Sequence, residues 1–486
     1  MAMIRDILRR KTDICRCVVI ADGQEIEYRE IINKAHAVQA LFCHAEKSEP
    51  VAVLLPNGSD FVAAFYGVIQ AGMVVLPMHT QLKKQEIARL LYHTKTKTVI
   101  TSFLYRSLME EIENEHALLL RIVFAEELPL LPSVQGSAIK VMEDDPMVLL
   151  CTSGTVGKPK IVQLSERNIL TSVRGYLEKV HVTESELETT RYFLAAPFSS
   201  AYGIMILTAC LMMGVPLATT SGTFTLDGFF RAVQRDKITH YEGGGIVIQF
   251  MEKMLGRPVG YDIRSLRFFG FGGSPVSGKT IEAVQNAYPD IVFLQGYGMT
   301  ESAPLITKQE RGVPIRAESV GTAINGVTIA IKTPDAITGA AYVHGEVVVK
   351  GDNVMLGYDQ NEAETNRVII DGYLHTGDIG YLDENGYLFL CGRKKNIILV
   401  RGFTVYPEEV ENCLMDSGLV DDCFVYGKMD EEGQEAVFAD VVPLYGPEML
   451  PEIAAYCQAN LASYKQPQQY YVCEGIKKNL SGKTER

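Results

Sequence analysis

The chain has 486 residues, more than a single hydrophobic core usually organises, so we expect at least two domains. Its hydrophobic content of 47% and charged content of 22% are ordinary for a soluble globular protein. The net charge of −13 argues against a nucleic-acid-binding surface as the main feature of the molecule.

The N-terminus does not have the pattern of a secretory signal. Residues 1–13, MAMIRDILRRKTD, carry too many charges for a signal and are compatible with a short amphipathic helix. The ten cysteines form no Cys-x-x-Cys pair, and Cys15 and Cys17 are too close together and too isolated for a zinc site. We therefore expect thiols in a reducing, cytoplasmic compartment.

Strand and helix patterns alternate between residues 50 and 102. The apolar runs PVAVLLPN (50–57), MVVLPMH (73–79) and TVITS (98–102) predict strands. SDFVAAFYGVIQAG (59–72), which ends in glycine, and QLKKQEIARLLYHTK (81–95) predict helices. This βαβ order predicts a largely parallel sheet.

A polar loop follows a buried strand predicted at Val148–Cys151. It runs from Thr152 to Lys160 and contains two glycines, three hydroxyl residues and two lysines. Glycine lets backbone N–H groups approach a phosphate, hydroxyls donate further hydrogen bonds, and lysine adds positive charge. The composition is therefore that of a phosphate-binding loop, although a polar turn between two strands can have the same composition.

A segment without charged residues extends from Tyr192 to Thr220, after a helix predicted at about 165–180. It is long enough to span a bilayer. Pro197, Gly214 and other prolines, glycines and serines interrupt it, so we predict a loop, one buried core helix and the start of a strand.

Three adjacent glycines occur at residues 243–245, before a helix predicted from about Val247. They do not favour a helix, so they either turn the chain or leave room for a ligand. The nearby His240 is expected to be structural rather than a ligand.

Residues 273–280, GSPVSGKT, match the GxxxxGK[ST] pattern of a P-loop. This pattern alone would indicate a P-loop phosphotransferase. However, Pro275 removes a backbone donor inside the loop, and no apolar strand ending in aspartate follows to hold magnesium. We therefore disfavour this interpretation.

The pattern changes between residues 320 and 390. The short runs GVTIAIKT, GEVVVKG and GYLFLCG, separated by Gly, Asp and Asn, predict an antiparallel β module. From about Lys395 onward the composition is more charged, and we expect a first domain of residues 1–394 and a second of residues 395–486.

Three segments of the predicted first domain resemble motifs of the adenylate-forming superfamily, which includes acyl-CoA synthetases, luciferases and nonribosomal adenylation domains. Residues 152–160, TSGTVGKPK, are similar to its TSGTTGxPKG loop, and residues 295–302, QGYGMTES, to its GYGxTE motif. Residues 272–276, GGSPV, occupy the place of its GGAPL-like segment. The resemblance implies that Gly273 and Ser274 border the adenine, which gives the P-loop pattern a different meaning.

The C-terminal third contains further segments of this kind. YLHTGD (373–378) and GRKK (392–395) resemble the superfamily's TGD and GRxK motifs. RGFTVYPEEVE (401–411) resembles a G-x-x-[VI]-x-P-x-E stretch of its small domain, and NLSGK (479–483) its NxxGK end motif. Because the motifs follow the superfamily's order, the resemblance implies an α/β fold. It comprises a large N-terminal domain of parallel α/β sheets with an antiparallel β module, plus a small α+β C-terminal lid domain.

The resemblance also implies roles for individual side chains. Tyr297 would stack on adenine, Thr300 would bond the α-phosphate, and Glu301 would hold Mg²⁺. Asp378 would accept hydrogen bonds from the ribose hydroxyls, and Arg393 would join the ribose and phosphate contacts. The residues implied in ATP or AMP binding are Thr152, Ser153, Gly154, Thr155, Gly157, Lys160, Gly273, Ser274, Tyr297, Gly298, Asp378 and Arg393.

Three implied roles belong to the predicted second domain. Lys395 would be the hinge between the domains, and Gly402 would let a pantetheine arm pass. Lys483 would bridge the carboxylate of the acid and the α-phosphate, where two anions must meet. The resemblance therefore assigns catalysis to Lys483, Thr300 and Glu301.

Four segments are expected to line the acid pocket: Pro197–Gly203, Tyr241–Gly245, Phe269–Ser274 and Gly298–Ala303. Amino-acid-activating relatives place an aspartate in the first of them, and this chain has no acidic residue there, so an amino acid is disfavoured. Ser200 replaces a histidine that many acyl- and aryl-CoA ligases carry. The glycines would permit a long or a flat apolar acid, so fatty and aryl acids both stay open. The pocket residues are Ser200, Tyr202, Gly243, Gly244, Gly272 and Met299.

The implied reaction has two halves. The acid's carboxylate attacks the α-phosphate of Mg·ATP and releases pyrophosphate, and a thiol then attacks the acyl-adenylate. The implied cofactors and co-substrates are Mg²⁺, ATP and coenzyme A. A carrier-protein phosphopantetheine presents the same thiol, so loading of an acyl carrier protein is the main alternative and a P-loop phosphotransferase is a distant one. We expect no nucleic-acid partner and no integral membrane segment.

Overall fold

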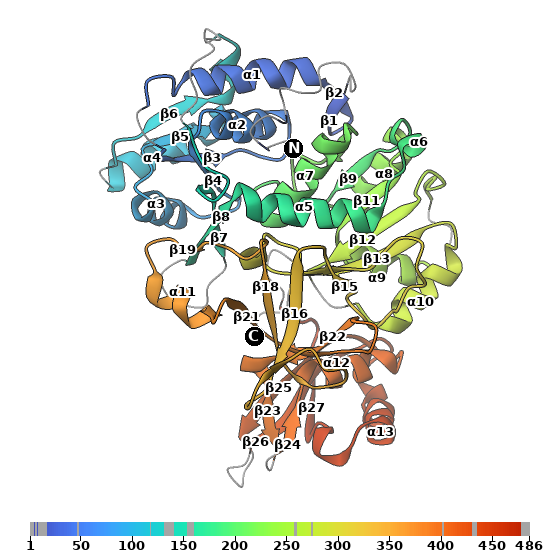
Figure 1. Cartoon of the computed structure of the whole chain (residues 1–486). Helices are drawn as coiled ribbons and strands as arrows, with labels where there is room; N and C mark the ends of the chain where they lie inside the picture. The colour runs from blue at the N-terminus through green and yellow to red at the C-terminus, as the bar shows by residue number, and fades with distance from the viewer. Residues whose placement is uncertain are drawn as a thin grey trace.

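The structure is a computed structural model, and Figure 1 shows its N-terminal sheets above and its C-terminal elements below. It describes Ile4, Ile7 and residues 17–45, 48–116, 118–130, 140–152, 160–256, 260–273, 276–400, 403–429 and 435–477. The short helix expected at residues 1–13 lies almost entirely outside this part of the chain. The predicted α/β fold class is confirmed: two largely parallel sheets precede an antiparallel sheet and a smaller C-terminal unit.

The alternation predicted between residues 50 and 102 belongs to a seven-stranded sheet. In spatial order its strands are β19 (Gly357–Tyr358), β8 (Lys160–Ser165), β7 (Pro146–Thr152), β4 (Val74–Pro77), β3 (Pro50–Leu54), β5 (Thr98–Thr101) and β6 (Arg121–Phe124). The five strands from β7 to β6 are parallel, as βαβ connections require, and β8 and β19 add antiparallel pairs at one edge. The helices of this region are α1 (Tyr28–Ala40), α2 (Ser59–Gln70), α3 (Lys84–His93) and α4 (Arg106–His116).

A second sheet has nine strands. In spatial order they are β15 (Thr322–Ala323), β14 (Thr307–Lys308), β13 (Val292–Tyr297), β12 (Phe268–Gly272), β11 (His240–Gly244), β9 (Tyr192–Leu194), β10 (Leu217–Thr219), β1 (Cys17–Ala21) and β2 (Gln24–Glu27). The six strands from β13 to β1 are parallel, so their carboxyl ends lie along one edge. The associated helices are α5 (Glu166–Val180), α6 (Glu184–Leu187), α7 (Ala201–Met213), α8 (Leu226–Asp236), α9 (Ile246–Lys253) and α10 (Gly278–Ala287).

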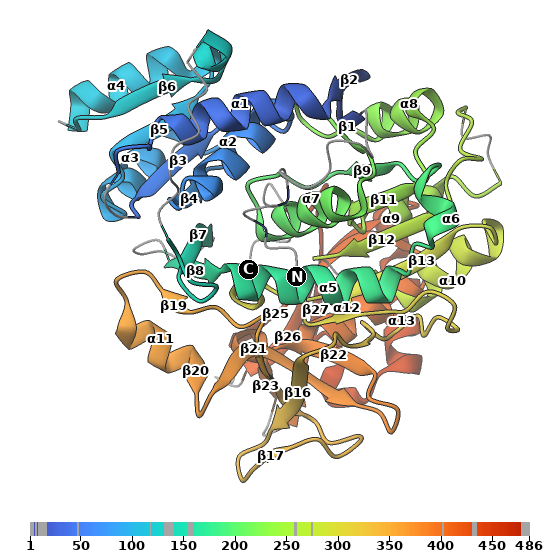
Figure 2. The same cartoon turned by 45° about the horizontal axis from the view of Figure 1, so that its top comes forward.

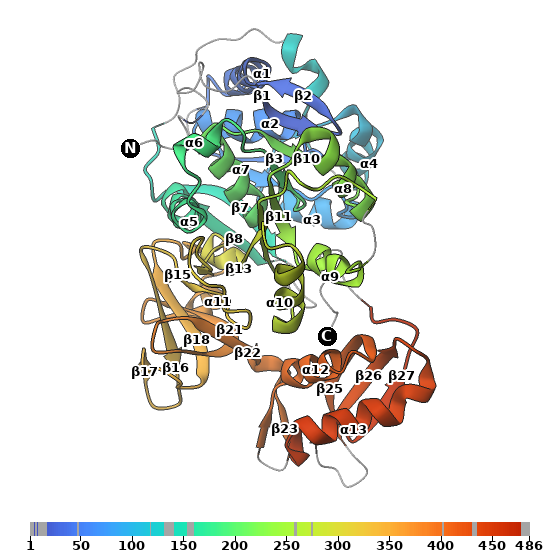
Figure 3. The ribbon, with the colours of Figure 1, turned by 90° about the vertical axis from the view of Figure 1, so that its right-hand side faces the viewer.

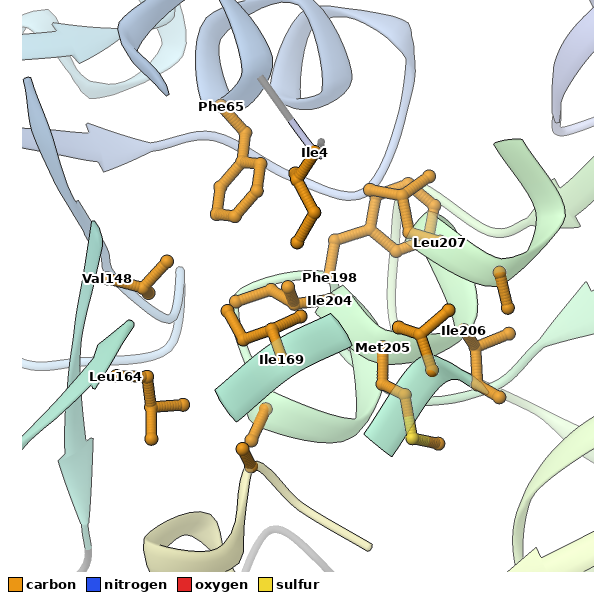
Figure 4. Close-up of a cluster of buried hydrophobic side chains, with 14 of the residues drawn as sticks. Ile4, Phe65, Val148, Leu164, Ile169, Phe198, Ile204, Met205, Ile206 and Leu207 are labelled. Carbon is orange, nitrogen blue, oxygen red and sulfur yellow. The ribbon is translucent and has the colours of Figure 1, made fainter. Parts of the chain in front are cut away.

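Helices α5 and α7 lie side by side between the two sheets, as Figure 2 shows. Their side chains share one apolar cluster with both sheets, and Figure 4 shows Val148 of β7, Ile169 of α5 and Ile204 of α7 in this layer. Helix α7 is apolar on every side, which is typical of a helix enclosed by protein. The core helix predicted within the uncharged segment 192–220 is therefore confirmed. Among the residues that the structure describes, every helix is too short or too polar to cross a membrane.

The antiparallel module predicted between residues 320 and 390 is also present. Its strands are β17 (Ile337–Thr338), β16 (Val327–Lys332), β18 (Gly345–Gly351), β21 (Tyr373–Leu382) and β20 (Ile369–Ile370), with β22 (Leu388–Arg393) paired to β21. All of these pairs are antiparallel. From this module β19 returns to pair with β8, and α11 (Glu362–Val368) follows it, so this segment lies against the hairpin that carries the predicted phosphate loop.

The C-terminal elements have a hydrophobic cluster of their own. They are β23 (Ile398–Val400), β24 (Phe403–Val405), α12 (Pro407–Asp416), β25 (Val420–Met429), β26 (Glu435–Pro443), α13 (Leu450–Asn460) and β27 (Gln469–Val472). Figure 3 shows them in orange to red below the nine-stranded sheet, with α12 nearest to α10. Lys279 of α10 forms an ion pair with Asp416 of α12 at 3.2 Å, and Lys253 of α9 forms another with Asp421 of β25. The domain division at residue 394 stays a prediction.

Candidate active site

Three residues with implied nucleoside roles meet at the end of β13. The hydroxyl of Tyr297 donates to Oδ2 of Asp378 at 2.6 Å, and Nε of Arg393 lies 2.9 Å from Oδ1 of the same carboxylate. Asp378 is buried, and it faces Arg393 because the two are register partners on β21 and β22. Burial and the Asp378 charge raise the pKa of Tyr297 well above its usual range, so its hydroxyl remains a donor. The cluster presents one fixed carboxylate, which is the kind of acceptor that two ribose hydroxyls need.

The turn after Tyr297 brings two stretches of backbone very close together. Its middle is a 3₁₀ turn at Thr300–Ser302, after which the chain returns so that the N–H of Ile306 donates to the carbonyl of Tyr297 at 2.9 Å. A Cβ atom on Gly298 would lie 1.8 Å from the carbonyl oxygen of Pro304, so only glycine fits. This geometry fixes where Thr300 and Glu301 stand relative to Tyr297.

Glu301 is connected to the hairpin that carries the predicted phosphate loop. The hydroxyl of Tyr358 donates to Oε1 of Glu301 at 2.8 Å, and the Nζ atom of Lys160 lies 5.4 Å from the centre of the Tyr358 ring. The hairpin itself pairs Thr152 with Lys160 in register. The contacts therefore run from Asp378 through the 297–301 turn to Lys160, the order in which ribose, α-phosphate and terminal phosphates follow one another in ATP.

Lys160 has an ionic partner that sequence reasoning missed. Its Nζ donates to Oε1 of Glu364 on α11, and this contact lowers the pKa of Glu364. Glu364 reaches the hairpin because β19 pairs with β8. These two strands are far apart in the sequence, so local sequence patterns could not predict the contact. Tyr358, which contacts both Lys160 and Glu301 in the structure, was missed for the same reason.

The carboxylate of Glu301 fits the proposed role of a magnesium ligand. Oε1 accepts the Tyr358 hydroxyl, while within the described part of the chain no side chain donates to Oε2. Among the residues that the structure describes, no group of three or more His, Cys, Asp and Glu side chains is placed so that it could hold a metal ion by itself. This is compatible with Mg²⁺, which usually takes one or two protein carboxylates together with phosphate and water oxygens.

The predicted acid-pocket segment 197–203 leads into the first turn of α7. Ser200 caps this helix: its Oγ accepts from the N–H of Gly203 at 3.0 Å and donates to the carbonyl of Pro197 at 2.8 Å. Asn57, from the connection between β3 and α2, fixes the segment further, because its side chain donates to the Ala196 carbonyl at 3.2 Å and accepts from the Phe198 N–H at 2.8 Å. Ser200 therefore has a structural role in addition to any contact with a substrate.

Glycines in register lie near the carboxyl ends of three neighbouring strands of the nine-stranded sheet: Gly244 and Gly272 are the last residues of β11 and β12, and Gly296 is the next to last of β13. Gly244 of β11 pairs with Gly272 of β12, and Gly272 pairs with Gly296 of β13. A Cβ atom on Gly272 would lie 2.6 Å from the carbonyl oxygen of Gly296, whereas one on Gly244 would meet no atom within 4 Å. This row of register partners thus forms an edge without side chains, with open space beside Gly244. Of glycines 243–245, Gly243 and Gly244 belong to β11, and Gly245 is the N-cap of α9, so only Gly245 lies where the chain turns.

A buried charged pair next to this edge was not anticipated from the sequence. Glu242 is 0% exposed and Lys308 is 1% exposed, and Oε1 of Glu242 lies 3.8 Å from Nζ of Lys308. The hydroxyls of Tyr176 and Tyr202 both donate to the Glu242 carboxylate. Burial lowers the pKa of Lys308, and the nearby carboxylate acts against this change. The only signal in the sequence was one glutamate inside an otherwise apolar and glycine-rich strand.

The remaining predicted site residues fall into two groups. Met299 is partly buried against the main apolar cluster, Gly273 has a positive φ of 81° with open space at its Cβ position, and Lys395 is exposed just before β23. The others lie outside the described residues: Ser153, Gly154, Thr155, Gly157, Ser274, Gly402 and Lys483.

The P-loop pattern at residues 273–280 does not direct its lysine into a phosphate-binding loop. Ser277 caps α10, with its Oγ accepting from the N–H of Thr280 at 3.1 Å. Lys279 is 60% exposed and contacts Asp416 of α12. His240, expected to be structural, is buried and stacks between Tyr192 and Phe268 with ring-centre distances of 4.7 and 5.2 Å.

Known proteins share both the sequence and the fold. The chain is 28% identical to a 4-coumarate–CoA ligase of Humulus lupulus over 95% of this chain and 88% of that enzyme. It is 27% identical to the 2-succinylbenzoate–CoA ligase of Bacillus subtilis over 96% of this chain and 93% of that enzyme.

Solved structures extend the similarity to the whole fold. An anthranilate CoA ligase in complex with anthranoyl-AMP matches with a TM-score of 0.89 and 21% identity, covering 99% of this chain and 95% of that one. The o-succinylbenzoate CoA synthetase of Bacillus subtilis, in complex with an acyl-adenylate, matches with a TM-score of 0.85 and 24% identity, covering 99% and 97%. At these identities the similarity establishes the fold.

Matches to family descriptions cover most of the chain. Residues 9–359 match the AMP-binding enzyme family, and residues 409–483 match the AMP-binding enzyme C-terminal domain. The match to the first description includes the phosphate-loop hairpin, the glycine-ended strands and the 297–301 turn. The chain therefore belongs to the AMP-binding enzyme family, within the adenylate-forming superfamily.

Proposed function

We propose that this enzyme joins a planar aryl acid to coenzyme A. Its class is that of an ATP-dependent, AMP-forming acyl-CoA ligase, with ATP, Mg²⁺ and coenzyme A as the partners of the acid. The observation that carries the proposal is the side-chain-free edge formed by Gly244, Gly272 and Gly296, with open space beside Gly244. A flat ring can lie against bare backbone, whereas a bulky side chain on these strands would exclude it.

The names of the relatives point in the same direction. 4-Coumarate, 2-succinylbenzoate and anthranilate, the acids named for three of them, all carry an aromatic ring. An amino acid remains disfavoured, because segment 197–203, where amino-acid-activating relatives carry an aspartate, has no acidic residue, and Glu242 of segment 241–245 is fully buried beside Lys308. In these two segments a substrate ammonium would find no free carboxylate.

In the first half-reaction, the enzyme positions ATP rather than reacting with it. Tyr297 holds the adenine, Asp378 and Arg393 hold the ribose, and Lys160 holds the departing pyrophosphate. Glu301 holds Mg²⁺, which supplies neutralisation of the phosphate charge when it is bound. The acid's oxygen bonds to the α-phosphorus while the bond to the β-phosphate oxygen breaks, and the fixed turn at 298–301 keeps these groups in place.

The second half-reaction needs the predicted C-terminal domain. The thiol of coenzyme A attacks the carbonyl carbon of the acyl-adenylate, a thioester forms, and AMP leaves. Lys483 aligns the acid in the first half and withdraws when the C-terminal domain rotates about Lys395, which brings the loop at Gly402 to the site.

The test is acid-dependent release of pyrophosphate, measured for 4-coumarate, anthranilate, dodecanoate and phenylalanine, with and without coenzyme A. We expect release with an aryl acid and acceleration by coenzyme A. Release driven only by dodecanoate or phenylalanine would refute the proposed acid. Release that coenzyme A leaves unchanged, with acyl-AMP retained on the enzyme, would identify a carrier-protein acceptor, and ADP in place of AMP would identify a P-loop phosphotransferase.

A further inference from the structure

The Glu242–Lys308 pair has no part in the mechanism described above. Both side chains are removed from water, and their charged atoms are 3.8 Å apart. Burying two charges is costly, and well-packed apolar residues of similar volume often serve stability equally well. A role other than stabilising the fold therefore explains the presence of this buried pair better.

The carboxylate of Glu242 is held from several sides. Oε1 accepts from Tyr176 of α5 at 2.6 Å, and Oε2 accepts from Tyr202 of α7. The ammonium of Lys308 lies 5.2 Å from the centre of the Tyr176 ring and 5.7 Å from that of Phe268. The pair thus ties β11 and β14 to both helices that cover the sheet, and it fixes the position of the Tyr202 ring.

The position of Glu242 relates it directly to the predicted acid pocket. Glu242 precedes Gly244 by two residues on β11, so both face the same side of the sheet, about 7 Å apart along the strand. Gly270 is its register partner on β12, and a Cβ atom there would lie 2.2 Å from Oε1 of Glu242. The carboxylate therefore fills the space that a side chain at residue 270 would take. This face of the sheet is open beside Gly244, whereas two residues earlier on β11 it is covered by the Glu242 side chain.

We propose that Glu242 and Lys308, together with the Tyr202 ring that they hold in place, form the end wall of the acid pocket and limit the length of the acid. The proposal rests on the proposed function and deepens it, because it selects short planar acids over long alkyl acids. A ring fits between the carboxyl edge and this wall, whereas a long alkyl chain would have to displace the buried side chains that fill the space beside Gly270. Glu242 and Lys308 are accordingly positioning and specificity-determining residues.

The test compares two double variants. E242A/K308M removes both charges together and empties the volume beside Gly270, whereas E242Q/K308M removes the charges and keeps the volume. The measured quantities are kcat/KM for butanoate, octanoate and dodecanoate, KM for ATP, and thermal unfolding. We expect E242A/K308M to raise the ratio of dodecanoate to butanoate activity about tenfold or more, since each methylene in an apolar pocket can change specificity by that factor. E242Q/K308M should keep the wild-type length profile, and KM for ATP should be unchanged in both.

A folded E242A/K308M enzyme with the wild-type length profile would overturn the proposal, as would an equal shift in both variants. If E242A/K308M does not fold, Tyr202→Ala removes the ring from the same wall while the ion pair stays, and it should lengthen the preferred acid. An unchanged profile in Tyr202→Ala would then overturn the proposal. Failure of the proposed function is recognised separately, because wild-type enzyme would then release no pyrophosphate with any aryl acid.

Discussion

Asp378→Asn tests whether the cluster of Tyr297, Asp378 and Arg393 binds the ribose of ATP. The substitution keeps the shape of the side chain and removes its charge. Tyr297 can still donate to the amide oxygen, and the guanidinium of Arg393, 48% exposed, can turn to water. We therefore expect the free energy of unfolding to fall by no more than about 1 kcal/mol.

The effect on ATP binding should be much larger. Hydrogen bonds to a charged group contribute about 1.5–3 kcal/mol, and a tenfold change in Kd corresponds to about 1.4 kcal/mol. The variant should accordingly bind ATP about 10- to 150-fold more weakly in titration calorimetry. KM for ATP in pyrophosphate release should rise by a similar factor, while KM for the acid at saturating ATP should stay unchanged.

Asp383→Asn is the matched control. Asp383 directly follows β21, is also buried beside an arginine, Arg316, and accepts the backbone N–H groups of Asn385 and Tyr387 at 2.9 Å. It has no implied contact with ATP, so this variant should lose stability and retain its affinity for ATP. Wild-type ATP affinity in Asp378→Asn, or an equal loss in Asp383→Asn, would refute the assignment of the ribose site.

Four further changes test other parts of the molecule. Burial lowers the pKa of His240 to about 3 from 6.5. Between these two pH values only the unfolded chain binds the proton, so the free energy of unfolding decreases as the pH is lowered. His240→Phe should remove up to about 1.4 kcal/mol per pH unit of that fall in urea unfolding, and an unaltered slope would contradict it. Glu364→Gln removes the ionic partner of Lys160, so the inhibition constant for pyrophosphate should fall about two- to fivefold. An unchanged inhibition constant would refute the assignment of Lys160 to the pyrophosphate site. Lys279→Ala should leave the rate of pyrophosphate release within about twofold of wild type, since its ion pair is exposed, and loss of activity would revive the P-loop interpretation. Lys483→Ala should abolish adenylate formation while calorimetry still detects ATP binding, and normal adenylation would refute the mechanism.

Local patterns predicted the elements well. The runs at 50–57, 59–72 and 73–79 fold as β3, α2 and β4 because their periodicity and bounding glycine or proline residues suffice to specify each element. The uncharged segment 192–220 was identified as a core helix with a loop and strand because Pro197 and Gly214 end its regular structure.

Pairings between distant parts of the chain could not be predicted in this way. Tyr358 and Glu364 reach Lys160 because β19 returns from the antiparallel module to pair with β8, and this register has no local sequence signal. Glu242 of β11 and Lys308 of β14 are in contact in the folded chain, and the sequence around neither residue indicates this contact. Roles in ATP binding could be predicted because the resemblance supplied them, whereas these contacts belong to the tertiary fold alone.

The two kinds of ion pair in this molecule have opposite consequences for movement. Lys279–Asp416 and Lys253–Asp421 join the C-terminal elements to α10 and α9, and both lysines are largely exposed. Exposed pairs contribute about 0–1 kcal/mol each, so they can separate at little cost when the C-terminal part rotates about the proposed hinge at Lys395. Separating Glu242 from Lys308 would instead leave a buried charge without compensation, which is strongly unfavourable. We therefore expect the charges at the predicted domain boundary to permit the rotation proposed for the second half-reaction, and those of the proposed end wall to keep it rigid throughout both halves.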